Sequence, residues 1–333
     1  MGDALGAPVE FLSLEKIRRE FGEDGIRDFS PAYGKLGAIT DDTQMTLFTA
    51  EGVIRAYLIS EERGIRRVSE PIHRAYLRWF ITQGEMPSDV NRRVTLDGGL
   101  VQLKPLWSRR APGLTCLSAL RATRGIGMPA DNDSKGCGTV MRTAPIGLGA
   151  PREEVFQLGM EASALTHGHV TATLSAGFLS LLISEIVNGA ELGKAIATAT
   201  IDLEKHPGHE ETLAAVQAAL LHATTGGGGD PLGQELGEGW IAEEAVAIAL
   251  YSVLVTSNFE DAVILAVNRD GDSDSTGAIA GNLAGALYGV EAIPARWLEP
   301  LELCDDIATL ADDLCQLVAG NLSPERQALY PWW

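Results

Sequence analysis

Apolar side chains recur every three to four residues through most of the chain, which is the spacing of helices that bury one face. In residues 41–60, DDTQMTLFTAEGVIRAYLIS, this period is carried by Leu47, Ile54 and Leu58 among others. No run of alternating apolar and polar residues is long enough to indicate a useful strand. The pattern predicts helices over residues 41–60, 71–84, 153–166, 169–189, 191–206, 210–225, 241–256, 259–269 and 275–289, with a final pair within 295–318.

Two segments interrupt the helical pattern. Residues 109–138 are rich in glycine, proline and arginine and are interpreted as a connection, and the short patch GGGGD at 226–230 is interpreted as a flexible surface loop. The GGGGD patch is too short to be a domain linker, and no internal repeat is visible. We therefore predict one compact all-α domain over residues 1–333, with about ten helices or more and several long loops that could carry function.

The composition and charge narrow the function classes. Hydrophobic residues make up 45% of the chain and aromatic residues 6%, with 37 glycines, which favours closely packed helices. The formal net charge of −19 disfavours an extended nucleic-acid surface or an anionic membrane as a partner, because the global field repels phosphates. A small phosphate-bearing ligand is still compatible if a metal or local backbone amides offset the field. The alternative reading of the acidity is solubility.

The cysteines contain no CxxC pair, which argues against a zinc ribbon or a thioredoxin-type site. They are interpreted as free thiols of a reducing cytoplasm. No signal peptide begins the sequence, and no apolar run is expected to reach the roughly 18 residues of a membrane span. The four cysteines of the chain are Cys116, Cys137, Cys304 and Cys315.

The segment NRDGDSDSTGAIAGNLAGALYG, residues 268–289, places aspartates at every second position, at Asp270, Asp272 and Asp274. A calcium loop of the EF-hand type is excluded. That loop needs glycine at its sixth position and glutamate at its twelfth, where this chain has Ser275 and Gly281.

The glycines of the same segment fall on one face of a helix. Glycine inside a helix costs about 1 kcal/mol relative to alanine, so a stripe indicates that another backbone approaches closely. Asp272, Asp274 and Ser275 would then lie at the N-terminal end of a central helix, where buried carboxylates need strong partners such as a divalent metal. Helix capping is the competing explanation, and one aspartate would satisfy it. The stripe consists of Gly277, Gly281, Gly285 and Gly289.

A second acidic helix start lies in AITDDTQMTL, at Thr40, Asp41 and Asp42. Capping again competes with metal binding. Two helix ends that both carry hydroxyl and carboxylate oxygens favour Mg²⁺, Mn²⁺ or Ca²⁺ over zinc. Such ends, facing one another, could hold two ions about 3.5–4 Å apart.

Three other segments carry candidate chemistry. In MGDALGAPVEF, Asp3 and Glu10 flank a turn, or belong to an ordinary solvated loop. In NDSKGCGTVMR, Gly136 and Gly138 could let backbone amides approach a diphosphate, although the segment lacks the ending of a P-loop and also fits a plain turn. In LTHGHV, a histidine could bind ligand hydroxyls or cap the following helix, and a zinc site is not expected.

Taken in order, these motifs resemble the ADP-ribosylglycohydrolase family, which includes dinitrogenase-reductase-activating glycohydrolases and ADP-ribosylarginine hydrolases. The family usually has an apolar helical segment before GDALG, whereas this sequence begins inside that motif. The resemblance covers nearly the whole chain through GDALGAPVEF, TDDTQMTL, SKGCGTVMRTAPIGL, THGHV, GEGWIAEEAVAIALY and NRDGDSDSTGAIAGNLAGALYG.

The resemblance implies a compact all-α fold with a central dinuclear metal cleft that holds two divalent cations, Mg²⁺ or Mn²⁺. Many relatives have threonine where this chain has Ser275, which keeps the hydroxyl, and Asp270 has no firm counterpart and is expected outside the ligand set. The implied metal ligands are Thr40, Asp41, Asp42, Asp272, Asp274 and Ser275. The implied substrate-binding residues are Glu10, Ser134, Gly136, Cys137, Gly138, Thr139, Met141 and His167.

The implied activity is hydrolysis of the C1″ glycosidic bond of an ADP-ribosylated substrate, with protein ADP-ribosyl-arginine favoured. Asp41, Asp42, Glu10 and Asp272 are the candidate catalytic residues, and the first three compete as the base that takes a proton from water. The alternatives are a non-catalytic ADP-ribose-binding protein, and a hydrolase of another ADP-ribose linkage or related nucleotide-sugar. The sequence does not determine the oligomeric state.

Overall fold

The computed structural model describes residues 1–63, 68–87, 94–225 and 232–331. Within these ranges the chain forms helices and no β-strand, which confirms the all-α prediction; two isolated bridges pair Ala32 with Lys35 and Gly136 with Ile241. The α-helices are α1 (Gly2–Gly6), α2 (Leu14–Phe21), α3 (Asp41–Arg63), α4 (Ser69–Thr82), α5 (Leu114–Ala122), α6 (Ala144–Gly149), α7 (Val155–Ala164), α8 (Val170–Val187), α9 (Leu192–Leu203), α10 (Glu210–Thr225), α11 (Ala242–Val255), α12 (Phe259–Val267), α13 (Ser273–Tyr288), α14 (Ala295–Leu298), α15 (Cys304–Val318) and α16 (Pro324–Gln327). The 3-10 helices are η2 (Leu100–Gln102), η3 (Lys104–Trp107), η4 (Cys137–Arg142), η6 (Gln234–Leu236) and η7 (Val290–Ala292).

The helices expected from the apolar period are present, with ends that differ by a few residues. The helix expected over 275–289, for example, is α13, which begins two residues earlier because the Asp272 side chain caps it. The interpretation of 109–138 as a connection is wrong in part, since this segment contains α5. The patch at 226–230 lies outside the described residues.

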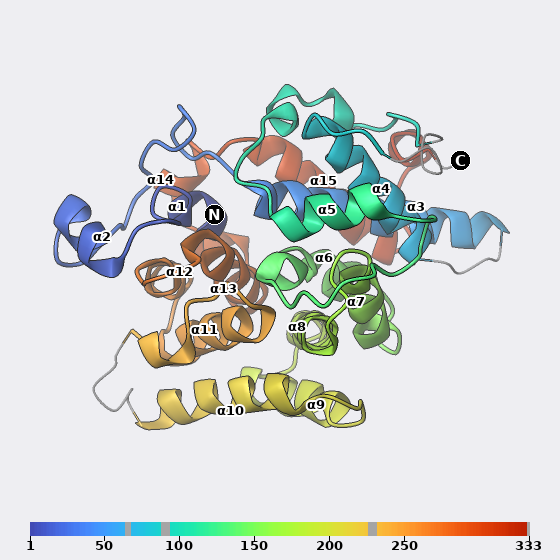
Figure 1. The fold of residues 1–333 in the computed structure, drawn as a ribbon. Helices are drawn as coiled ribbons and strands as arrows, with labels where there is room; N and C mark the ends of the chain where they lie inside the picture. The colour runs from blue at the N-terminus through green and yellow to red at the C-terminus, as the bar shows by residue number, and fades with distance from the viewer. Residues whose placement is uncertain (64–67, 88–93, 226–231, 332–333) are drawn as a thin grey trace.

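Two hydrophobic clusters make the interior. One lies among α8, α11, α12 and α13 and includes Phe178 and Leu250, and the other joins α3, α4 and α15 and includes Phe48 and Trp79. In Figure 1, α9 and α10 lie along the lower edge beneath α8 and α11, while α3, α4, α5 and α15 form the upper part. Helix α6 and the turn η4 contact both α3 and α8, and so connect the two clusters.

The N-terminal helix α1 packs against α13 through glycine. A Cβ atom on Gly2 would lie 1.8 Å from the carbonyl oxygen of Gly277, and one on Gly277 would lie 2.7 Å from the carbonyl oxygen of Gly2. The predicted close approach of a second backbone is therefore confirmed at Gly277. It is wrong for Gly285, where a Cβ atom would meet only the Phe259 side chain, at 4.0 Å. It is also wrong for Gly289, which ends the helix with a φ of 75°, a conformation that favours glycine.

Helix α8 corrects another expectation. It is 18 residues long with a mean hydropathy of 1.7, so by length and composition it could cross a membrane, contrary to the sequence-based expectation. However, 78% of it is buried inside the protein, where it packs against α6, α7, α9 and α11. A helix that is apolar on all sides and covered on all sides is typical of the core of a large helical domain.

Candidate active site

The two acidic helix starts meet at the boundary between the two hydrophobic clusters. Asp41 and Asp42 begin α3, and Asp272 and Asp274 begin α13. The groups lie close enough for the charge of Asp272 to raise the pKa of Asp41, and for the charge of Asp42 to raise the pKa of Asp274. The structure thus brings together two segments that are about 230 residues apart in the sequence.

Helix capping accounts for part of this arrangement. The Thr40 hydroxyl accepts a hydrogen bond from the Asp42 amide at 3.3 Å, and the Asp272 carboxylate accepts one from the Ser275 amide at 3.3 Å. Asp3, on α1, accepts from the amides of Thr40 and Thr43 at 3.0 Å and 3.1 Å. Capping and metal binding are competing explanations for these acids, and capping leaves several of the carboxylates without a capping role.

Those carboxylates are buried together. Burial, followed by repulsion from neighbouring acids, raises the pKa of Glu10 to about 9. Burial also raises the pKa of Asp41 to about 8, against a hydrogen bond that its Oδ2 accepts from the Gly113 amide at 3.1 Å. The pKa values of Asp42 and Asp274 lie well above the usual range for the same two reasons, and the pKa of Asp272 is raised by burial.

The donor chemistry of this cluster fits hard divalent cations. Asp42 Oδ1 and Glu10 Oε2 are buried and have no hydrogen-bond partner within the described parts of the chain. Buried, mutually repelling carboxylates are stabilised by a cation more effectively than by hydrogen bonds alone. No three acidic, histidine or cysteine side chains among the described residues are arranged around one cation position. The fit therefore rests on the charge and the free oxygens of the cluster, and it does not rest on preformed coordination.

Glu10 reaches the cluster from the loop between α1 and α2. The next residue, Phe11, stacks on Trp240 with ring centroids 6.2 Å apart and an angle of 16° between the rings, although both side chains are exposed. Trp240 Nε1 donates to Glu238 at 3.1 Å. Tyr33 also lies nearby, since burial and then Glu10 raise the pKa of its phenol. The sequence contained no signal that singled out Phe11, Tyr33 or Trp240.

The glycine loop of η4 lies beside the acids. Cys137 Sγ donates to Asp272 Oδ2 at 2.8 Å, which joins the predicted ADP-ribose segment to the start of α13. The Ser134 hydroxyl lies 3.1 Å from the hydroxyl of Thr115. Thr139 and Met141 are buried, and the Thr139 hydroxyl donates to the Gly136 carbonyl at 3.2 Å. Their role in substrate binding stays a prediction, as it does for Ser134, Gly136, Cys137 and Gly138.

The two histidines of LTHGHV have different roles in the structure. His169 Nδ1 accepts a hydrogen bond from the Thr171 amide at 3.2 Å and so caps α8. His167 is buried against Gly136 and Gly138, and Nδ1 lies 2.8 Å from the Thr166 hydroxyl. The capping alternative thus applies to His169, while His167 lies beside the glycine loop.

Asp270 does not join the acid cluster. Its Oδ1 accepts a hydrogen bond from the Leu14 amide at 2.8 Å at the start of α2, and the side chain is exposed. This agrees with its expected place outside the ligand set.

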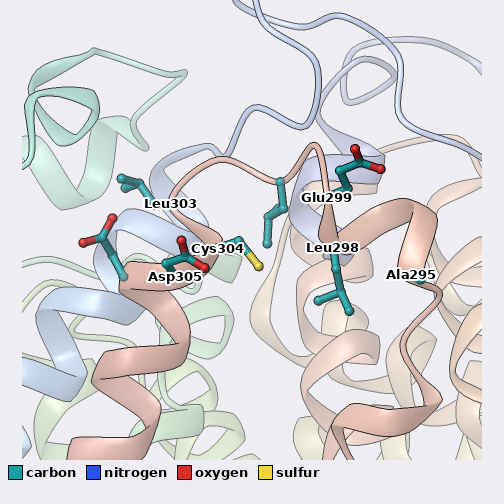
Figure 2. Close-up of a pocket in the computed structure, with 8 residues that line it drawn as sticks. Ala295, Leu298, Glu299, Leu303, Cys304 and Asp305 are labelled. Carbon is teal, nitrogen blue, oxygen red and sulfur yellow. The ribbon is translucent and has the colours of Figure 1, made fainter.

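Two cavities contain none of the acids at the two helix starts in their lining. One of about 640 Å³ lies between α14 and the start of α15, where Leu298, Cys304 and Asp305 are among its lining residues (Figure 2). Another of about 320 Å³ lies along α13 and α15 and includes Asp3 and Met141 in its lining. None of the six predicted metal ligands lines either cavity.

Comparison with known proteins gives a consistent picture. The ADP-ribosylglycohydrolase family profile matches residues 1–323. An uncharacterised protein of Archaeoglobus fulgidus is 32% identical over 95% of this chain and 93% of its own. ADP-ribosylarginine hydrolase Tri1 of Serratia proteamaculans is 27% identical (94% and 76% coverage), and ADP-ribosyl-[dinitrogen reductase] glycohydrolase of Rhodospirillum rubrum is 26% identical (91% and 87%). A solved structure, an ADP-ribosylglycohydrolase-related protein complex, has a TM-score of 0.65 and 29% identity, covering 95% of this chain and 94% of that one.

Together the fold and these relatives define a hydrolase that acts on the glycosidic bond of an ADP-ribosylated substrate. The chain belongs to the ADP-ribosylglycohydrolase family. The resemblance inferred from the six motifs is thereby confirmed, and so is the expectation of an enzyme.

Proposed function

We propose that the chain releases ADP-ribose from arginine side chains of modified proteins, with the help of two divalent cations, Mg²⁺ or Mn²⁺, in the cytoplasm. The observation that carries the proposal is the burial of Glu10, Asp41, Asp42, Asp272 and Asp274 in one cluster with two unpartnered carboxylate oxygens. The relatives named ADP-ribosylarginine hydrolase support arginine as the acceptor.

The cations would be held by oxygens from both helix starts. When bound, they would orient the diol of the distal ribose and lower the pKa of a water molecule. The hydroxyls of Thr40 and Ser275 add neutral oxygen donors, so the ligand set does not consist of mutually repelling charges alone. The proposed ligands are Thr40, Asp41, Asp42, Asp272, Asp274 and Ser275.

Among the candidate bases, Glu10 fits best. It approaches from a loop, whereas Asp41 and Asp42 are fixed in the first turn of α3. Its Oε2 has no hydrogen-bond partner among the described residues, and bound cations would favour the ionised form of Glu10, which is the form that accepts a proton. Water would attack C1″ as the C1″–N bond breaks through an oxocarbenium-like transition state, and Glu10 Oε2 would take the proton of that water. The electron pair of the broken bond would leave with the guanidine nitrogen of the released arginine.

The glycine loop would bind the diphosphate of the substrate, and the aromatic pair Phe11 and Trp240 would bind the arginine side chain at its other end. The backbone of Gly136 and Gly138 would hold the diphosphate through amides, with Ser134, Cys137, Thr139 and Met141 shaping that segment. The exposed faces of Phe11 and Trp240, next to the Glu238 carboxylate, offer a surface for a planar cation such as guanidinium. This surface supports arginine over a hydroxyl acceptor.

The decisive assay is a panel of ADP-ribose linkages. Proteins or peptides modified on arginine or serine, a modified nucleic-acid base and a free metabolite are incubated with the purified chain and added Mg²⁺ or Mn²⁺. We expect fastest release of ADP-ribose from arginine, and loss of release after exhaustive chelation. Faster cleavage of another linkage would overturn the choice of acceptor, and full activity without cations would overturn the use of metal.

Matched aspartate variants test the acid cluster. Asp41→Asn and Asp272→Asn should each lower kcat/KM by about 100-fold or more, because each removes a charge from the reacting centre. Asp270→Asn, two residues from Asp272 but outside the cluster, should keep nearly full activity. Circular dichroism checks that the helices of all three variants are intact. Equal activity of the Asp272 and Asp270 variants would contradict the proposed site.

A further inference from the structure

Arg142, the last residue of η4, is a fully buried cation in an unusual setting. Among the described residues, no carboxylate forms an ion pair with it, and its Nε has no hydrogen-bond partner. Its guanidinium donates to Thr166 Oγ1 at 2.5 Å, lies 3.4 Å from Cys116 Sγ and 3.5 Å from Met45 Sδ, and stacks 4.4 Å from the centre of the Tyr76 ring. Burying a charge without a counter-ion is costly, which suggests a role beyond packing.

The protons of this contact can be assigned from the donors and acceptors. Arginine has only donors, so Thr166 Oγ1 must accept from Arg142. The single hydroxyl proton of Thr166 is then directed to His167 Nδ1 at 2.8 Å, because the other acceptor, the Ser163 carbonyl, is 3.5 Å away. His167 Nδ1 therefore accepts, and a neutral imidazole in this position carries its proton on Nε2.

The ring stays neutral across the physiological range. Burial, together with the positive charge of Arg142, lowers the pKa of His167 to about 3. The positive charge of Arg142 thus opposes a second proton on the ring, and the Thr166 hydroxyl selects the tautomer by occupying Nδ1.

The Nε2 edge of His167 faces the glycine loop. A Cβ atom on Gly136 would lie 3.2 Å from Nε2, and one on Gly138 would lie 3.2 Å from Cε1, so the loop lies against the ring edge. Among the hydrogen bonds of the described residues, none uses Nε2, whereas Nδ1 is occupied by Thr166. Cys137, between these two glycines, donates to Asp272, so the loop that contacts the His167 ring also contacts the acid cluster.

We propose that Arg142, acting through Thr166, fixes His167 as a neutral Nε2–H donor to an oxygen of the bound nucleotide-sugar. Arg142 and Thr166 are then positioning residues, since neither reaches the ligand itself. The ligand part of this inference rests on the proposed function, because it requires ADP-ribose beside the glycine loop. The tautomer itself does not depend on the function.

The first test is a spectrum of the full chain without ligand. The ¹⁵N shifts of the His167 ring are measured by NMR at neutral pH and assigned by comparison with His167→Gln. We expect a protonated Nε2 and an unprotonated Nδ1 in the wild type and in Thr166→Ser, which keeps the hydroxyl. Thr166→Val, which replaces the hydroxyl by a methyl group, should show a substantial Nδ1–H population. A wild-type His167 ring with its proton on Nδ1 would overturn the proposal, whether or not the Thr166 variants fold.

The second test is affinity for ADP-ribose, measured by calorimetry in the presence of Mg²⁺. Thr166→Val should weaken binding about three- to tenfold, the usual effect of one neutral hydrogen bond, while Thr166→Ser should bind within about twofold of the wild type. A changed tautomer with unchanged affinity would overturn the ligand contact. If the spectra and affinities are as expected but no linkage is cleaved, the proposed function is wrong, while the positioning of His167 by Arg142 and Thr166 is confirmed.

Discussion

At the residue scale, the acid cluster makes stability depend on pH in a defined direction. The folded pKa values of Glu10 and Asp41, about 9 and about 8, lie above the ordinary values of 4.5 and 3.8. At pH values between the ordinary and the folded pKa of each group, the folded state holds more protons than the unfolded state. The free energy of unfolding therefore falls as pH rises through this range. For chelated protein we expect the Tm to drop by several degrees between pH 6 and pH 8.5, measured by scanning calorimetry.

The cation should reverse this trend. Divalent ions bind the ionised carboxylates, so added Mg²⁺ or Mn²⁺ should raise the Tm more at pH 8.5 than at pH 6. Glu10→Gln should flatten the pH slope of the chelated protein, and Asp270→Asn, whose side chain lies outside the cluster, should leave it unchanged. A Tm that does not respond to pH, or a larger gain from the cation at pH 6, would contradict the assignment.

At the element scale, the contact between α1 and α13 predicts opposite effects of the same substitution. A Cβ atom on Gly277 would lie 2.5 Å from Val267 Cγ1 and 2.7 Å from the Gly2 carbonyl oxygen, while one on Gly285 would meet its nearest atom, in Phe259, at 4.0 Å. Gly277→Ala should therefore destabilise by about 1–3 kcal/mol through overpacking. Gly285→Ala should be neutral or stabilise by up to about 1 kcal/mol through helix propensity.

Urea unfolding of the two variants measures the difference directly. Because the substitution is identical and both sites lie on one helix, the comparison removes the intrinsic preference of alanine for helix. Equal stabilities would mean that α1 does not pack on α13 as described. A loss of activity in Gly277→Ala alone would further link this contact to Asp272 and Asp274 at the start of the helix.

The same elements show what the sequence could and could not predict. Long helices such as α3 and α13 were predictable because buried faces repeat over several turns. Helix α1 was not, since five residues that are all buried show no period. Asp3 of this helix caps α3 although it lies 37 residues before Thr40 in the sequence. The residues that flank the start of α3 give no indication that a distant side chain caps it. Thr166 and Arg142 were missed for a similar reason. Their proposed role depends on the hydrogen bonds that connect Arg142 to Thr166 and Thr166 to His167, and only the fold shows these contacts.

At the scale of the whole molecule, the candidate site lies where two hydrophobic clusters meet. Asp41 and Asp42 extend from the cluster of α3 and α4, and Asp272 and Asp274 from the cluster of α11 and α13. The convergence of these acids could be expected from their motifs, whereas the aromatic pair at Phe11 and Trp240 joins two loops that only the fold brings together. A cation bound between the helix starts would therefore also hold the two halves of the interior together.

The net charge of −19 gives the last prediction, which concerns binding of the anionic ligand. The lysine of the glycine loop, Lys135, already pairs with Glu211 at 2.8 Å and with Glu243, so it adds little positive charge. Attraction for the diphosphate must then come from short-range amides and from the cations, while the rest of the surface repels it. Salt screens this long-range repulsion, with a Debye length of about 10 Å at 0.1 M, more than it weakens buried contacts. Raising KCl from 50 to 300 mM at fixed Mg²⁺ should therefore leave the Kd for ADP-ribose unchanged or lower it by up to about threefold, as measured by calorimetry. A protein that binds phosphates through surface lysines and arginines shows the opposite slope, so a Kd that rises tenfold over this range would contradict a site built from backbone amides and buried cations.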